Sequence, residues 1–142
     1  MTGSDSWSSE GEPRLVPATA ADATILVVDD DPAVLEVAAR VLERVGYRVI
    51  GATQPEEALR LARDHRGRLD LVLTDVVMPG MGGRELGERL ARQRPEARIL
   101  YMSAYTEDEA LLRGIEFNRT RFIGKPFSLE GLTQAVREAL AD

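Results

Sequence analysis

Residues 25–32 read ILVVDDDP, an apolar run that ends in three aspartates and a proline. A short apolar run of this kind is typical of a strand that is buried on both faces of a parallel sheet. Asp31 directly precedes Pro32, so we expect it to cap a helix that has proline at its first position. Asp29 and Asp30 are not needed for that cap, and their place at a strand end indicates a separate role.

The rest of the chain repeats this unit, because four more short apolar runs alternate with amphipathic helical patterns. Five such units, each joined by a right-handed crossover, predict an α/β fold with one five-stranded parallel sheet and helices on both faces. The strand order expected for such a sheet is 2-1-3-4-5, which makes the first and third strands neighbours. The expected strands are residues 25–28, 47–50, 69–73, 98–102 and 121–123.

Capping signals predict where several helices begin and end. The first helix is expected to end at Gly46, and Ser128 is expected to cap the last helix. Capping boxes mark the starts of the second and fourth helices, and they pair Thr53 with Glu56 and Thr106 with Glu109. The buried stripe of the last helix is expected to comprise Leu129, Leu132, Val136, Ala139 and Leu140.

The composition excludes several classes of function. The chain has 142 residues, a formal charge of −6, no cysteine and a single histidine, His65. A disulfide scaffold, a thiolate zinc site and a cysteine nucleophile are therefore excluded, and one histidine gives little scope for a Ser-His-Asp triad. The acidic balance disfavours nucleic-acid binding, and no apolar run approaches the roughly 18 residues of a membrane span. We expect a cytoplasmic protein.

The chain divides into two parts by composition. Residues 1–23 are rich in Ser, Gly, Glu and Pro without an apolar period, so we interpret them as a flexible tail or linker. Residues 24–142 form the expected domain. Nine arginines between Arg60 and Arg98 are expected on solvated faces, because interspersed acids offset them.

Polar residues follow the expected strands at their carboxyl ends, which meet at one edge of a parallel sheet. Two carboxylates 4 Å apart repel by roughly 4 kcal/mol at an effective dielectric near 20, so a cation is expected among these residues, and oxygen ligands suit Mg²⁺. Asp75 can then take a phosphoryl group as a nucleophile, with Lys125 and Ser103 binding the phosphoryl oxygens. The full set is Asp29, Asp30, Asp75, Ser103 and Lys125, the last being the only lysine of the chain.

Four segments together resemble the receiver domain of response regulators in two-component signalling. They are ILVVDDDP at 25–32, LVLTDVVMPGMGG at 71–83, ILYMSAY at 99–105 and FIGKPF at 122–127. The resemblance covers nearly all of residues 24–142. Within it, the sequence is similar to the carboxyl-terminal receivers of hybrid sensor histidine kinases. It implies a flavodoxin-like receiver fold and a signalling phosphoacceptor in a phosphorelay, rather than an enzyme.

The resemblance also implies a role for individual residues at the acidic edge. Asp75 is expected to accept phosphate from a histidine kinase or a phosphotransfer protein. Asp30, Asp75 and the backbone carbonyl of Val77 are expected to ligate Mg²⁺, and Asp29 is expected to act through a metal-bound water.

Further roles concern the switch. Ser103 and Lys125 match the hydroxyl and the lysine that bind the phosphoryl group, and Phe122 matches the aromatic switch residue. Switching is expected to remodel a protein-interaction surface. The downstream target stays unspecified, as does the oligomeric state, for which a homodimer is one option.

Two alternatives stay open from the sequence. A Mg²⁺-dependent aspartyl-phosphate hydrolase of the haloacid-dehalogenase type also uses a strand-end DxD, which Asp29 and Asp31 satisfy, but a late acidic pair after Lys125 is missing. A non-phosphorylated receiver-like interaction module is the second alternative.

Overall fold

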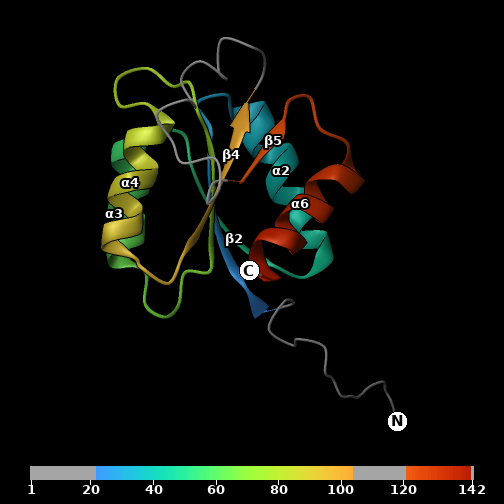
Figure 1. Cartoon of the computed structure of the whole chain (residues 1–142), viewed down its shortest axis with the longest axis horizontal. Coiled ribbons are helices and arrows are strands. Elements are labelled where there is room, and N and C mark those ends of the chain that lie inside the picture. Colours follow the sequence, from blue (N-terminus) through green and yellow to red (C-terminus); the bar gives the residue numbers. More distant parts are fainter. Residues whose placement is uncertain (1–21, 104–120, 142) are drawn as a thin grey trace.

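A five-stranded parallel sheet forms the centre of the molecule (Figure 1). The computed structural model describes residues 22–103 and 121–141. Within them the strand order is β2-β1-β3-β4-β5, which confirms the predicted fold class and order. The strands are β1 Thr24–Val28, β2 Arg48–Ala52, β3 Leu71–Asp75, β4 Arg98–Ser103 and β5 Arg121–Gly124.

Helices cover both faces of the sheet. Figure 1 shows α2 (Pro32–Val45) and α6 (Leu129–Ala141) on one face, and α3 (Pro55–Asp64) and α4 (Gly83–Gln93) on the other. Alternate residues of β1 pack on opposite faces of the sheet, since Ile25 and Val27 belong to one core cluster while Leu26 and Val28 belong to the other. All residues of β1 and β3 are buried, as their apolar runs predict. Among the described residues, no helix combines the length and the apolarity needed to cross a membrane.

The strand register decides which strand ends lie side by side. Val28 of β1 pairs with Thr74 of β3, so the residues that follow them, Asp29 and Asp75, lie at the same level of the sheet. Ser103 of β4 pairs with Gly124 of β5, which places Lys125 directly beyond this pair.

Three predicted helix ends are confirmed. The Asp31 carboxylate accepts a hydrogen bond from the Ala33 N–H at 2.9 Å and caps α2. Gly46 ends the same helix with φ 116°, a left-handed conformation that favours glycine. The Ser128 hydroxyl oxygen accepts from the Gly131 N–H at 2.8 Å in the first turn of α6.

Two helix predictions need correction. The N-cap of α3 is Gln54 rather than Thr53, because Pro55 is the first helical residue, and Glu57 instead of Glu56 accepts from the Thr53 N–H at 3.4 Å. In α6, Leu129 is 59% exposed, because it is the first residue of the helix and the buried stripe starts one turn later. The stripe consists of Leu132, Val136 and Ala139, with Leu140 half-buried. The box formed by Thr106 and Glu109 lies outside the described residues, as does most of the expected tail.

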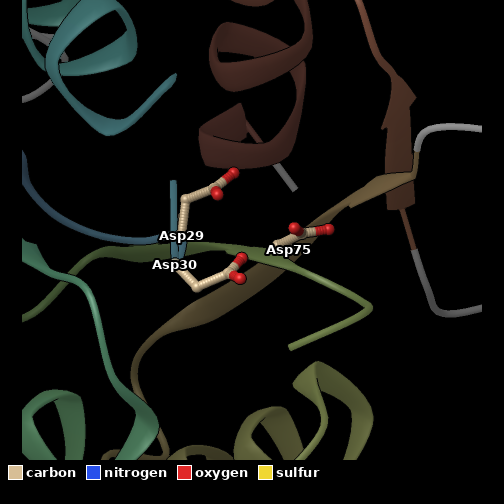
Figure 2. A group of neighbouring side chains, drawn as sticks. All are labelled: Asp29, Asp30 and Asp75. Atoms are coloured by element: carbon tan, nitrogen blue, oxygen red, sulfur yellow. The ribbon is translucent and has the colours of Figure 1, made fainter. Parts of the chain in front are cut away.

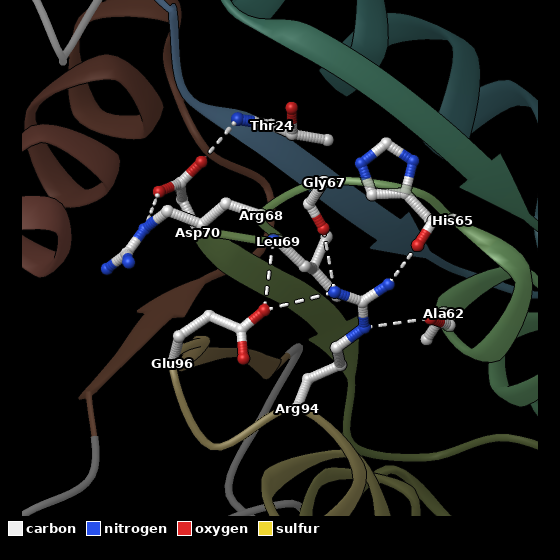
Figure 3. Close-up of polar contacts among 9 residues, drawn as sticks. All are labelled: Thr24, Ala62, His65, Gly67, Arg68, Leu69, Asp70, Arg94 and Glu96. Carbon is white, nitrogen blue, oxygen red and sulfur yellow. Dashed lines mark hydrogen bonds and ion pairs between the residues drawn. The ribbon is translucent and has the colours of Figure 1, made fainter.

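Arg94 departs from the prediction that the arginines of this region are solvated. Figure 3 shows its guanidinium beside the end of α3, where it donates to the carbonyls of Ala62 (2.9 Å), Gly67 (2.8 Å) and His65. It also pairs with Glu96 at 3.1 Å. These carbonyls belong to the end of α3 and the loop that follows, where a helix leaves backbone acceptors without intrahelical partners. Arg94 therefore ties α4 to the end of α3.

Gly87 lets α4 approach the sheet closely. A Cβ atom at this position would lie 2.2 Å from the hydroxyl oxygen of Tyr101, a buried residue of β4. Burial raises the pKa of Tyr101 to about 12, with a further rise from Glu88 and an opposing effect of Arg84. The helix and the strand are thus in contact at a point that has no room for a methyl group.

Gly87→Ala is expected to lower the free energy of unfolding by about 1 to 2 kcal/mol, because overpacking outweighs the gain of about 1 kcal/mol in helix propensity. Urea unfolding followed by circular dichroism measures the change. Tyr101→Phe removes the hydroxyl, so the double variant is expected to lose less stability than the sum of the two single variants. A Gly87→Ala protein as stable as the unsubstituted chain would contradict this account.

Candidate functional site

Three carboxylates meet at the carboxyl edge of the sheet. Asp29 follows β1, Asp30 comes next in the chain, and Asp75 is the last residue of β3. One oxygen of each lies within 4.8 Å of the others, and Figure 2 shows the three side chains at the adjacent ends of these strands. Among the described residues, these three carboxylates form the group that lies close enough together to hold one metal ion.

Lys125 reaches the same point from β5. Its Nζ donates to Asp29 Oδ2 at 3.0 Å and to Asp75 Oδ2 at 3.2 Å. Its backbone N–H donates to the carbonyl of Ser103 at 2.8 Å, which holds the loop after β5 against the end of β4. The structure therefore joins the ends of β1, β3 and β5 through one ammonium group.

The charges of this cluster do not balance. Asp29 is 0% exposed and Asp75 is 6% exposed, while Asp30 is exposed. Burial raises the pKa of Asp75; the charge of Lys125 opposes this rise and that of Asp29 adds to it. Burial would lower the pKa of Lys125, but hydrogen bonds and charges from Asp29 and Asp75 outweigh burial and raise it. One ammonium faces three carboxylates, so negative charge remains in excess.

The donor set fits a hard divalent cation. Carboxylate oxygens from two strand ends match the preference of Mg²⁺ for oxygen ligands. Asp31 is not part of the cluster, because its carboxylate accepts from the Ala33 N–H at the start of α2. The three consecutive aspartates thus divide into one helix cap and two members of the acidic site.

Of the remaining predicted site residues, Val77 contacts this cluster, while Ser103 and Phe122 lie on the neighbouring strands β4 and β5. The Val77 N–H donates to Asp75 Oδ1 at 3.4 Å, so the loop after β3 holds the carboxylate from the backbone. Ser103 is half-buried at the end of β4. Phe122 lies on β5 and is 43% exposed, so its ring stands partly at the surface.

Gly83 is a positioning residue that sequence reasoning missed. A Cβ atom here would lie 1.9 Å from the Asp75 carbonyl oxygen and 2.9 Å from the Val76 Cα. Its N–H donates to the Val76 carbonyl at 2.9 Å. No sequence signal distinguishes Gly83 from Gly82, because the distinction comes from the approach of α4 to β3.

Comparison with known proteins identifies relatives over most of the chain. The model of the family described as the response regulator receiver domain matches residues 25–137. The sensor kinase CckA of Brucella abortus is 38% identical over 83% of this chain, and the DNA-binding transcriptional regulator NtrC of Azospirillum brasilense is 37% identical over 83%. The chain spans only 12% and 24% of the lengths of these two proteins.

A solved structure supports the same assignment. The receiver domain of the hybrid histidine kinase CckA is 34% identical, with a TM-score of 0.69 over 83% of this chain and 99% of that one. The fold and the sequence therefore agree on one family.

Asp30→Asn is expected to raise the melting temperature of the metal-free protein by a few degrees, because it relieves repulsion among the three carboxylates. The same change is expected to remove most of the stabilisation that Mg²⁺ adds to the unsubstituted chain. Thermal unfolding in EDTA and in millimolar Mg²⁺ measures both effects.

The matched control is Asp31→Asn, since asparagine caps helices about as well as aspartate. It is expected to keep the full Mg²⁺ increment. The assignment of the metal-binding residues would be overturned if Mg²⁺ still raised the melting temperature of Asp30→Asn but no longer raised that of Asp31→Asn.

Gly83→Ala is expected to destabilise the protein and to weaken Mg²⁺ binding at least tenfold, because the new Cβ must displace the backbone of Asp75. Gly82→Ala is the control, since a Cβ there would meet the Val76 carbonyl oxygen at an ordinary 3.5 Å. Mg²⁺ titrations followed by amide chemical shifts compare the two. Equal affinities would show that Gly83 does not position the site.

Proposed function

The chain belongs to the family of response-regulator receiver domains of two-component systems, and from this premise we propose that Asp75 is its phosphoacceptor. The observation that carries the proposal is the position of Lys125 Nζ, which contacts both Asp29 and Asp75 beside a third carboxylate. This arrangement provides a nucleophile, a fixed cation and a set of metal ligands within one small volume.

The acceptor role follows from how Asp75 is held. The Val77 N–H binds one carboxylate oxygen and Lys125 binds the other. A carboxylate fixed in this way can attack the phosphorus of a phosphohistidine, so that a P–O bond forms and the P–N bond breaks with its electron pair going to the histidine nitrogen. We assign the donor to a histidine kinase or a phosphotransfer protein.

Lys125 and Ser103 are proposed to bind the transferred group. Lys125 keeps Asp29 as a partner when the phosphoryl oxygens replace Asp75 Oδ2 at its ammonium, so its charge stays in place during transfer. The hydroxyl of Ser103 stands at the end of the neighbouring strand and is proposed to donate to a phosphoryl oxygen. Positioning and charge neutralisation of this kind supply most of the catalysis of phosphoryl transfer.

Mg²⁺ is the proposed cofactor. Asp30, Asp75 and the Val77 carbonyl would hold it, and Asp29 would act through a water bound to it. When bound, the ion supplies the positive charge that the acidic cluster lacks and neutralises the incoming phosphoryl group.

The proposed output is a change of surface at the β4–β5 side of the sheet. Phe122 pairs with Tyr101 across these strands, and Ser103 lies at the end of the same strand as Tyr101. Movement of Ser103 toward a phosphoryl group on Asp75 would open space into which the exposed Phe122 ring packs. Because phenylalanine has no hydroxyl, this switch would work by packing alone.

The larger context is also a proposal. We assign residues 24–142 to the receiver domain, residues 1–23 to a tail or linker, and the protein to the cytoplasm. The domain would act either as a separate regulator or as the receiver of a hybrid kinase, and a homodimer is one form in which it would signal.

The position of Asp31 argues against the hydrolase alternative. The DxD motif of that family would need the side chains of Asp29 and Asp31 to act at one reaction site, but the Asp31 carboxylate caps α2 instead. A non-phosphorylated receiver-like module stays as an outcome of the experiment below.

Incubation with acetyl phosphate and Mg²⁺ is expected to add one phosphoryl group to the unsubstituted chain and none to Asp75→Asn. Intact-mass spectrometry measures the products, and Asp31→Asn serves as the control that still becomes labelled. Rapid turnover of acetyl phosphate without accumulation would favour the hydrolase. An absence of any label on the unsubstituted chain would favour the non-phosphorylated module.

A further inference from the structure

A basic groove lies at the amino end of the sheet, opposite the acidic site. It has a volume of about 720 Å³, and the starts of β1 and β2, the loop after α3 and the end of α6 line it. Four arginines face it against two aspartates, Asp22 and Asp70, in a chain whose formal charge is −6. The arginines are Arg48, Arg66, Arg68 and Arg137. Positive charge is therefore concentrated here on an otherwise acidic protein.

Three of these arginines make no ion pair with any residue of 22–103 or 121–141: Arg48, Arg66 and Arg137. Several arginines on helix faces elsewhere have acidic partners one turn away, such as Arg40 with Glu36 at 2.6 Å and Arg89 with Glu85 at 2.7 Å. The chain carries 24 acidic residues, so acidic partners are plentiful. The groove instead leaves three guanidinium groups available to a ligand.

The wall of the groove is already fixed. Arg94 holds the loop after α3 through the carbonyls of His65 and Gly67 (Figure 3). Asp70 accepts from the Thr24 N–H at 2.8 Å and from Arg68 Nε at 2.7 Å, so its charge is already satisfied. A ligand would therefore bind without first ordering this loop, which favours affinity.

The groove also has an apolar part. The ring of Tyr47 is buried, and Leu140 beside it is half-buried. Burial raises the pKa of Tyr47 while the charge of Arg137 lowers it, so this arginine acts on the same part of the groove. A ligand with a charged part and a flat or apolar part would match both features.

We propose that this groove binds a nucleoside polyphosphate. Guanidinium groups bind phosphate oxygens through two parallel hydrogen bonds, and three of them call for more than one phosphate. The volume falls within the range of about 300 to 1,000 Å³ typical of small-molecule sites. The base would pack on Tyr47 and Leu140. The five-residue strand β1 separates Thr24 at the groove from Asp29 by roughly 15 Å, so the ligand would leave the phosphoacceptor free.

Titrations of the full chain test the proposal, with EDTA present so that the acidic site holds no metal–nucleotide complex. The probes are ATP, GTP, pyrophosphate and adenosine, and amide chemical shifts report binding. ATP or GTP is expected to bind saturably, and adenosine at least tenfold more weakly. Affinity is expected to fall as salt rises, since exposed arginines provide the attraction.

The variants compare arginines of equal charge inside and outside the groove. The double variant Arg48→Gln with Arg137→Gln is expected to weaken nucleotide binding at least tenfold. Arg44→Gln with Arg92→Gln is the matched control, because neither residue lines the groove and neither pairs with an acid in the described part of the chain. Thermal unfolding confirms that both variants fold.

Several outcomes would overturn the proposal. They are the absence of saturable binding by any polyphosphate, an equal loss in the control variant, and binding of a hexaglutamate peptide in place of the nucleotides. Asp75→Asn is expected to bind nucleotides normally, so failure at the groove and failure of the proposed acceptor function give different results.

Discussion

The ammonium of Lys125 between Asp29 and Asp75 is the contact on which the site depends. It joins the ends of three strands that are not consecutive in the chain, and it offsets part of the repulsion between two buried carboxylates. The parallel sheet makes this contact possible, because the pairing of Val28 with Thr74 brings both aspartates to one level. The register between β1 and β3 therefore determines the relative positions of the two aspartates at the site.

The sequence predicted the sheet and the acidic cluster well for the same physical reason. Apolar runs as short as residues 25–28 are recognisable without tertiary information, and carboxyl ends of parallel strands always meet at one edge. The features it missed depend on distant neighbours. Arg94 resembles any other surface arginine until the end of α3 lies against it, and Gly83 resembles Gly82 until α4 packs on Asp75.

Local signals failed where two of them competed. Thr53 with Glu56 satisfies the spacing of a capping box, yet Pro55 fixes the first helical residue and moves the cap to Gln54. Leu129 has the right spacing for the stripe of α6, but the stripe packed into the core starts one turn later. In both cases the pattern correctly predicted a helix. Its first capping or buried residue lies elsewhere, because of a constraint at the helix terminus.

The two ends of the sheet also differ in charge for a reason rooted in the topology. Helices that follow parallel strands direct their N-termini toward the acidic edge and their C-termini toward the opposite edge, where partial negative charge gathers. Basic residues at that edge would offset this charge, and Arg94 does so for α3 by binding its terminal carbonyls. Arg94 meets that need only at the end of α3, and neither Arg48, at the start of β2, nor Arg66, in the loop after α3, has an acidic partner among the described residues. Their charge is left available at the groove, which is why a ligand there is the simpler account.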